Sequence, residues 1–146
     1  ILYPLIKRLT TLGIPVMGHL GLTPQSVHQL GGYHLQGKSE EDALRLEQEA
    51  LGLEEAGCFA LVLEKVPATL AERVAKRLHI PVIGIGAGSG VDGQVLVSQD
   101  MLGMEESFSP KFLRRFGQVG SAIRSAVSDY VEAVRDGSFP SESESY

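Results

Sequence analysis

Three short apolar runs, separated by helix-like segments, are the feature that most constrains the fold of this sequence. Two of them open with the same residues, IPV, at 14–16 and 80–82, and the other spans 59–63. Runs of this length without polar alternation are typical of strands that are buried on both faces of a sheet. Strands that alternate with helices favour a parallel sheet built from right-handed crossovers. We therefore predict an α/β fold.

The residues at the ends of these runs indicate a functional site. The first run leads to His19, the second ends in Glu64, and the third passes into a turn that contains Gly86 and Gly88. Parallel strands end at a common edge of the sheet, and α/β folds place their chemistry there. We therefore expect His19, Glu64 and the Gly86 turn to lie along one edge.

Glu64 is the residue whose position most needs a reason. A buried carboxylate costs several kcal/mol unless it is paired or protonated, and this one closes a run of five apolar residues. General acid/base catalysis is one such reason. The alternative is a structural glutamate that pairs with Lys65 or with a helix N-terminus. Residue type alone leaves both interpretations open.

A glycine-rich segment follows the third run. Residues 88–93, GSGVDG, match the spacing Gly-x-Gly-x-x-Gly of dinucleotide sites. Such a motif must leave a strand and open a helix, whereas residues 94–97 are typical of a short strand. We expect instead a loop that allows a ligand or a neighbouring backbone to come close, with main-chain N–H groups available to an anion.

Helices are predicted around these runs. Apolar periodicity and capping residues place them at 1–12, from Ser39 to 56, and at 67–78, and at least one more lies within 110–137. The connection 21–39 is longer than the usual two to six residues or so. Its glycine-rich part could form a lid over a site or a static surface loop.

Composition limits the possible partners. A formal net charge of −5 without a cluster of Lys or Arg argues against nucleic acid and against an anionic membrane, which leaves a small molecule or a protein. Cys58, the one cysteine, should be a small buried hydrophobe in a reducing compartment. No apolar run approaches the roughly 18 residues of a membrane helix. We expect a cytoplasmic protein with no membrane contact, in which His28 and His34 are surface residues and 141–146 form a disordered acidic tail.

Taken in order, the motifs resemble the ketopantoate hydroxymethyltransferase family. The resemblance is collinear over nearly the whole sequence, which makes it far more specific than any one glycine pattern. The matching segments are GHLGLTPQSV at 18–27, GGY at 31–33, LVLE at 61–64, VP at 66–67, IPVIGIGAG at 80–88, DGQ at 92–94 and PKF at 110–112.

The resemblance implies a (β/α)8 TIM barrel, of which residues 1–140 would be the C-terminal half, strands 5–8 with their flanking helices. A whole barrel takes about 250 residues. The family transfers a hydroxymethyl group from 5,10-methylenetetrahydrofolate to 3-methyl-2-oxobutanoate and gives 2-dehydropantoate, in pantothenate biosynthesis. It uses a magnesium ion to chelate the keto acid and forms a homo-oligomer, usually a decamer. We expect keto acid, folate and further copies of the chain as partners.

The resemblance also implies roles for particular residues. Glu64 matches the proton acceptor of the family. His19 should face the substrate pocket as a hydrogen-bond donor or as packing, and Gly86 and Gly88 should border the same pocket. The magnesium ligands of the family belong to the first half of the barrel, so we assign none here. The alternative to an enzyme is a non-catalytic half-barrel that needs a partner to cover its open strand edges.

Overall fold

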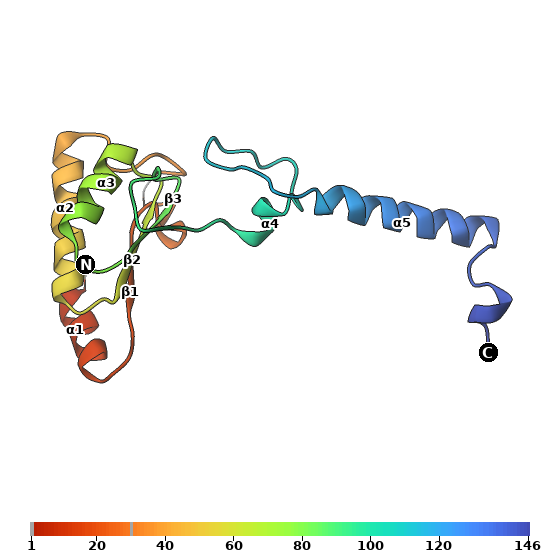
Figure 1. Cartoon of the computed structure of the whole chain (residues 1–146), viewed down its shortest axis with the longest axis horizontal. Coiled ribbons are helices and arrows are strands. Elements are labelled where there is room, and N and C mark those ends of the chain that lie inside the picture. Colours follow the sequence, from red (N-terminus) through yellow and green to blue (C-terminus); the bar gives the residue numbers. More distant parts are fainter. Residues whose placement is uncertain (1, 30) are drawn as a thin grey trace. The chain divides into compact units, whose positions relative to one another are not determined.

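The computed structural model describes residues 2–29 and 31–146. It divides the chain into two compact units, Ile1–Val95 and Leu96–Tyr146, and each is described by itself below. Figure 1 shows the first unit as a sheet with its helices and the second as mainly helical.

A four-stranded parallel sheet forms the centre of the first unit. Its strands are β1 (Met17–Gly21), β2 (Ala60–Glu64), β3 (Val82–Ile85) and β4 (Gly93–Gln94), and they lie in the order β1-β2-β3-β4. Strand order follows chain order, as it does around a TIM barrel. The predicted α/β class is confirmed, and the sheet agrees with half of a (β/α)8 barrel.

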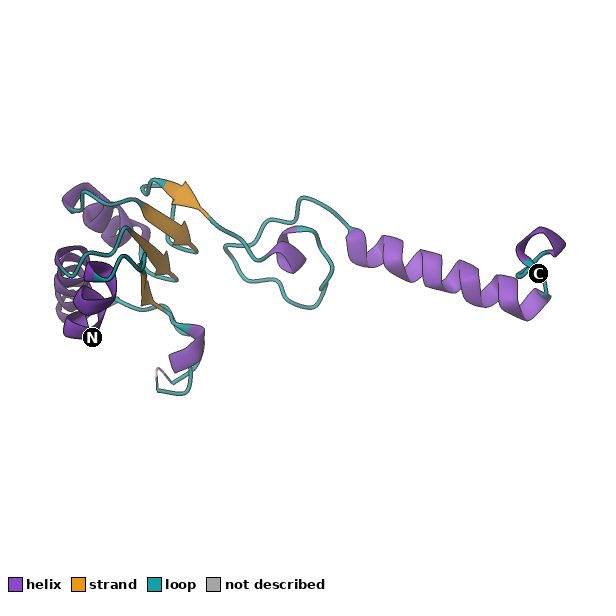
Figure 2. Ribbon diagram, turned by 90° about the horizontal axis from the view of Figure 1, so that it is seen from below, coloured by secondary structure: helices purple, strands orange, loops and turns teal. Residues whose placement is uncertain are grey.

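Helices cover one face of this sheet. They are α1 (Tyr3–Thr11), α2 (Glu40–Glu55) and α3 (Ala68–Arg77), and the short 3-10 helix η1 (Pro24–Ser26) follows β1. Figure 2 shows the three α-helices stacked beside the strands. The predicted helices of this unit are confirmed to within about two residues at their ends.

Strand alternation divides the sheet into a helix-covered face and an open face. In β2, Leu61 and Leu63 are completely buried, whereas Val62 and Glu64 are only half-buried. The covered face packs against α2 and α3, and the core consists of Leu20, Ala43, Leu46, Ala50, Leu53, Cys58, Leu61, Leu63, Val66, Leu70, Ala71, Val74, Leu78, Val82 and Ala87. Glu64 therefore lies on the open face, in register with Gly21 of β1 and Ile85 of β3.

Local sequence signals account for the helix ends. The Ser39 hydroxyl accepts a hydrogen bond from the Asp42 N–H (3.1 Å) and caps α2, whose first turn is acidic as the helix dipole favours. Pro4 lies in the first turn of α1, where its missing N–H costs nothing. On the surface of α3, the Lys76 ammonium donates to the Glu72 carboxylate at 2.6 Å, as the i, i+4 spacing predicts.

The second unit contains the helix that was expected within 110–137. Its helices are α4 (Ser98–Met101), α5 (Val119–Asp136) and the 3-10 helix η2 (Glu142–Glu144). Phe112 and Phe116, which continue the helical spacing of apolar residues, lie before the start of α5. The Phe116 N–H donates instead to the Met101 carbonyl at 2.8 Å, and this turn delays the helix.

The C-terminal end of the second unit is locally structured. Helix α5 ends at Gly137 with φ +80°, which glycine adopts without strain. In the segment 141–146, expected to be a disordered tail, the Ser141 N–H donates to the Glu144 carboxylate (2.8 Å) and closes the turn of η2. No helix in the described parts of the chain is both long and apolar enough to cross a membrane.

Candidate functional site

The carboxyl edge of the sheet brings two of the predicted site residues together. Glu64 ends β2 and pairs in register with Gly21 of β1 and Ile85 of β3. His19 lies two positions before Gly21 and opposite Val62. Because side chains alternate along a strand, His19 and Glu64 project from the same, open face.

The side chains of His19 and Glu64 contact each other. Nε2 of His19 lies 3.2 Å from Oε2 of Glu64, and the two side chains are 32% and 18% exposed. Nε2 is buried, and it has no aligned hydrogen-bond partner among the described residues. The Glu64 carboxylate thus lies at ion-pair distance from Nε2, but the two groups are not aligned for a hydrogen bond.

Lys65 does not take the place of His19 as the partner of Glu64. Its ammonium donates instead to the Tyr33 carbonyl, and its carbonyl accepts from the Gln36 N–H at 2.9 Å. Its φ of +53° is unusual for a residue with a side chain. Lys65 thus connects the loop after β1 to the end of β2, and the Glu64–Lys65 pair weighed as a structural alternative is not present.

The backbone at the end of β2 is also held in place. The Leu22 N–H donates to the Glu64 carbonyl at 2.8 Å, and the Lys65 N–H donates to the Ile85 carbonyl at 2.9 Å. The main chain on either side of Glu64 is therefore bonded to both neighbouring strands or their extensions. The position of the carboxylate then depends on the rotamer of the Glu64 side chain.

Gly86 and Gly88 have clear reasons to be glycine within this fold. Their φ values are +61° and +80°, which side chains rarely adopt. A Cβ at Gly88 would lie 2.4 Å from Cβ of Ala68, at the start of α3. The predicted close approach of a neighbouring backbone is therefore found. Their placement beside the substrate stays a prediction.

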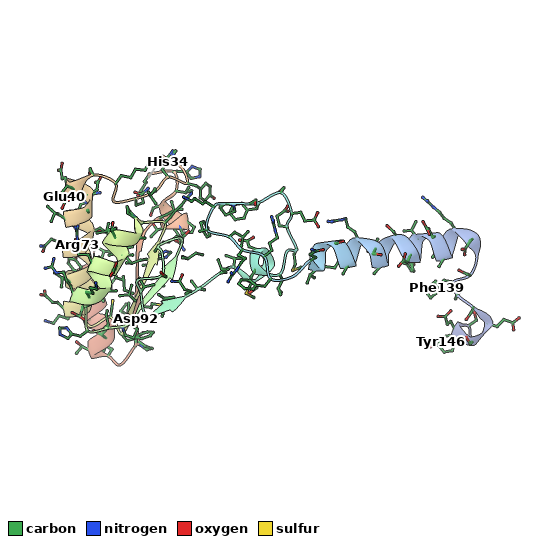
Figure 3. All side chains as sticks on the ribbon, turned by 45° about the horizontal axis from the view of Figure 1, so that its top comes forward. His34, Glu40, Arg73, Asp92, Phe139 and Tyr146 are labelled. Carbon is green, nitrogen blue, oxygen red and sulfur yellow. The ribbon has the colours of Figure 1, made fainter. Side chains whose placement is uncertain are left out.

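Asp92 anchors the glycine-rich loop to β3. Its carboxylate accepts a hydrogen bond from the Val82 N–H at 2.8 Å, and its own N–H donates to the Val82 carbonyl at 3.0 Å. Figure 3 labels Asp92 near the strands. The Gln94 amide donates to the Gly88 carbonyl at 2.8 Å, and Gly93–Gln94 form β4. The loop thus leads into a strand and not into a helix, which argues against the dinucleotide motif; the strand occupies 93–94, whereas 94–97 was expected.

The described residues do not fit a magnesium site. Within residues 2–29 and 31–146, no group of three or more His, Cys, Asp or Glu side chains is placed to hold a metal ion. Magnesium prefers an octahedron of oxygen ligands, and beside Glu64 the nearest titratable group is an imidazole. His28 and His34 are exposed on the loop after β1.

Comparison with known proteins decides the family. The model of the family described as ketopantoate hydroxymethyltransferase matches residues 2–142. The chain belongs to the ketopantoate hydroxymethyltransferase family. It is 57% identical over 141 residues to the 3-methyl-2-oxobutanoate hydroxymethyltransferase of Phocaeicola vulgatus, with 97% of this chain and 52% of the relative covered. The corresponding enzyme of Nitratidesulfovibrio vulgaris is 57% identical over 137 residues, with 94% of this chain and 45% of the relative covered.

Coverage shows how much of a ketopantoate hydroxymethyltransferase these residues represent. The enzyme of Syntrophus aciditrophicus is 54% identical over 141 residues, and 52% of it is covered. The chain thus spans about half the length of the curated relatives that it matches. Within the ketopantoate hydroxymethyltransferase family, the sheet β1 to β4 is a parallel half-barrel that carries Glu64 on its open face.

Two sets of contacts were not predicted from the sequence: those of Lys65 beside the site, and those of Asp92 with Val82 at the start of β3. Nothing in the sequence marks residue 65 as one with positive φ, because this conformation is usually occupied by Gly, Asn or Asp. Asp92 had a usable signal. A carboxylate within a glycine-rich loop often bonds to nearby backbone N–H groups, here that of Val82.

Proposed function

We propose that this chain supplies the proton acceptor of a 3-methyl-2-oxobutanoate hydroxymethyltransferase. The observation that supports this proposal is the position of Glu64. Its carboxylate ends a parallel strand, is 18% exposed, and lies on the open face of the sheet within 3.2 Å of His19. A base at such a strand end can reach a substrate held in the centre of a barrel.

The proposed reaction begins with deprotonation of the keto acid at C3. The C3–H bond breaks, the proton passes to Glu64, and the electron pair forms the enolate of 3-methyl-2-oxobutanoate. Water hydrolyses the methylene bridge of 5,10-methylenetetrahydrofolate, breaking both of its C–N bonds, and gives formaldehyde and tetrahydrofolate. The enolate carbon then forms a bond to the formaldehyde carbon and leaves an alkoxide on the new hydroxymethyl group. The alkoxide takes up the proton that Glu64 holds, which gives 2-dehydropantoate and regenerates the carboxylate.

The remaining parts of the site are proposals as well. Since the described residues do not fit a magnesium site, we propose that the ion takes its ligands from outside this chain. His19, Gly86 and Gly88 are proposed to border the keto acid, and the whole enzyme to be a homo-oligomer, a decamer as in the family. The buried free cysteine, Cys58, suits a reducing compartment, so we place the reaction in the cytoplasm.

A non-catalytic half-barrel is the second candidate. The observation that favours it is coverage, since the matched relatives are about twice as long as the chain. Without the other half, the open face has no counterpart to hold the substrate opposite Glu64. The two candidates differ in what happens when the first half of a relative is supplied.

The test uses residues 1–146 joined to the first half of the Phocaeicola vulgatus relative. Exchange of the C3 proton of 3-methyl-2-oxobutanoate with D₂O is followed by NMR without folate, in the joined enzyme and in its Glu64→Gln variant. We expect a loss of about 100-fold or more, because glutamine keeps the shape but cannot accept the proton. Glu72→Gln, an exposed partner of Lys76, is the control and should exchange normally.

Two results would contradict the proposal. Normal exchange in Glu64→Gln would exclude Glu64 as the base. No exchange in the joined wild-type enzyme, with folding confirmed by circular dichroism and keto-acid binding confirmed by calorimetry, would favour the non-catalytic half-barrel.

A further inference from the structure

We infer that His19 is a positioning residue that orients the Glu64 carboxylate, and that it acts on the substrate only through Glu64. This inference rests on the proposed function of Glu64 as the base. It differs from the roles expected from the sequence, in which His19 faces the substrate pocket as a hydrogen-bond donor or as packing. In this role, His19 determines which carboxylate oxygen of Glu64 faces the substrate, and it restricts rotation of the carboxylate.

The sheet register determines that these two side chains meet. β1 and β2 are adjacent and parallel, with His19 opposite Val62 and Gly21 opposite Glu64. Two side chains on the same face of neighbouring strands can reach each other when they are two residues out of register, as His19 and Glu64 are. Hydrogen bonds hold the backbone of β2 at Glu64, so the contact depends on the two side chains alone.

Competing partners are engaged elsewhere. The nearest cation in sequence, Lys65, donates to the Tyr33 carbonyl, which leaves His19 beside the carboxylate. Nε2 of His19 is buried but lacks an aligned hydrogen bond within the described residues. A buried ring nitrogen without a partner costs free energy. A small rotation of either side chain would convert the 3.2 Å contact into a hydrogen bond and remove this cost.

The contact assigns different tasks to the two carboxylate oxygens. With Oε2 facing Nε2 of His19, Oε1 is the oxygen that remains to take the proton from C3. A carboxylate whose rotation is already restricted loses less entropy on reaching the transition state for proton transfer. Removing His19 should therefore lower the rate constant of proton abstraction and leave the affinity for the keto acid nearly unchanged.

The first experiment tests the contact in this chain without any reaction. Histidine residues are labelled with ¹⁵N, and the Nε2 resonance of His19 is compared between the wild-type chain and Glu64→Gln. We expect a clear shift of this resonance, because the group facing Nε2 changes from a carboxylate to an amide. His79 and Glu54 are the matched control, since they are 3.6 Å apart but His79 is 94% exposed.

In the control, Glu54→Gln should leave the His19 resonance unchanged. If circular dichroism shows a folded chain and the His19 resonance in Glu64→Gln is unchanged, the contact is absent and the inference is overturned.

The second experiment measures C3 proton exchange in the joined enzyme described above. His19→Leu keeps the volume but removes the ring nitrogens, and we expect the exchange rate constant to fall about 100-fold with an unchanged KM for the keto acid. His19→Gln carries an amide that can donate near the position of Nε2, so it should restore most of the rate. Thermal melting of both variants shows whether they fold. If the leucine variant does not fold, the exchange rate constant and KM of the glutamine variant are compared with the wild-type values.

The outcomes separate the inference from the proposed function. A raised KM with a normal rate constant in His19→Leu would show direct substrate binding and overturn the positioning role. A normal rate constant and KM in His19→Leu would overturn it too. Normal exchange in Glu64→Gln would overturn the proposed function and with it the role of His19, while the ¹⁵N experiment would still show whether the contact exists.

Discussion

Gly21 lies directly against the main chain of Glu64. A Cβ at Gly21 would be 2.1 Å from the Glu64 carbonyl oxygen and 2.8 Å from Cγ1 of Val66. The φ of Gly21 is +87°, which residues with a side chain rarely adopt. The end of β1 can therefore approach the end of β2 this closely only with glycine at this position.

Gly21→Ala should destabilise the first unit by more than the conformational cost of a positive φ. That cost alone is about 1–2 kcal/mol, and the clash with Glu64 adds to it because the contacted atom is backbone. Urea denaturation of the chain, followed by circular dichroism, measures the effect. Gly13→Ala is the matched control, since φ is +81° there and no atom lies within 4 Å of its Cβ position. Equal destabilisation by the two variants would contradict the prediction.

Glu47→Ala should be strongly destabilising, because Glu47 links α2 to α3. Its side chain is 4% exposed, and it accepts hydrogen bonds from Arg73 and, at 2.6 Å, from Arg77. Figure 3 labels Arg73 on α3, the helix that faces α2. Breaking a buried ion pair typically costs about 3–5 kcal/mol, and the half-exposed arginines place this case at the lower end.

The same denaturation experiment tests this prediction. Glu72→Ala removes an exposed pair with Lys76 and should change the midpoint little. A Glu47→Ala midpoint close to that of Glu72→Ala would show that the Glu47 pairs contribute nothing measurable.

Cys58 should make the stability of the chain fall at alkaline pH. Burial raises the pKa of the Cys58 thiol above its ordinary value, so the folded chain holds this proton more tightly than the unfolded chain. The stabilisation is complete below the ordinary thiol pKa, about 8.5, and is lost as pH rises through the folded value. Burial also raises the pKa of Tyr3, with Glu49 and Glu55 adding to it, and this acts in the same direction.

Two measurements check the role of Cys58. Its reaction with a disulfide reagent at pH 8.5 should be at least about tenfold slower in the folded chain than in urea, since the thiolate is the reactive form. Cys58→Ala should flatten the loss of stability between pH 8 and 10. Equal thiol reactivity in the folded and unfolded chain would contradict the prediction.

The chain alone should show no hydroxymethyl transfer and no specific magnesium binding. Its described residues form no metal-binding group, and the open face of the sheet lacks an opposing half. We also expect it to associate with itself or with a supplied first half, since open strand edges and apolar faces favour pairing. Light scattering and an assay of 2-dehydropantoate, with and without the first half of a relative, test these statements. Full activity from the chain as a monomer would refute them.

Periodicity and capping signals were sufficient to predict the first unit. The apolar runs gave the parallel strands, and Ser39 and Pro67 marked the starts of α2 and α3 to within one residue. These signals are local, since a cap or an apolar stripe acts within a turn or two of its own helix. The edge shared by His19 and Glu64 followed from the same pattern, because parallel strands end together.

Features that depend on long-range contacts could not be predicted. The sequence offered Lys65 or a helix N-terminus as a structural partner of Glu64. It could not predict the contact with His19, because Lys65 instead reaches Tyr33 across the loop. The start of α5 within 110–137 could not be predicted for a similar reason. Phe116 continues the apolar spacing of the helix, but its N–H is engaged by Met101, fifteen residues earlier in the chain.

The adjacency of β1 and β2 has a consequence for how such a site can be rearranged. His19 and Glu64 belong to consecutive strands of a single strand-helix-strand repeat, joined only by the loop after β1 and α2. A circular permutation that opens the chain anywhere outside that repeat would leave the pair untouched. The His19–Glu64 contact could therefore be transferred into another parallel barrel as one strand-helix-strand repeat.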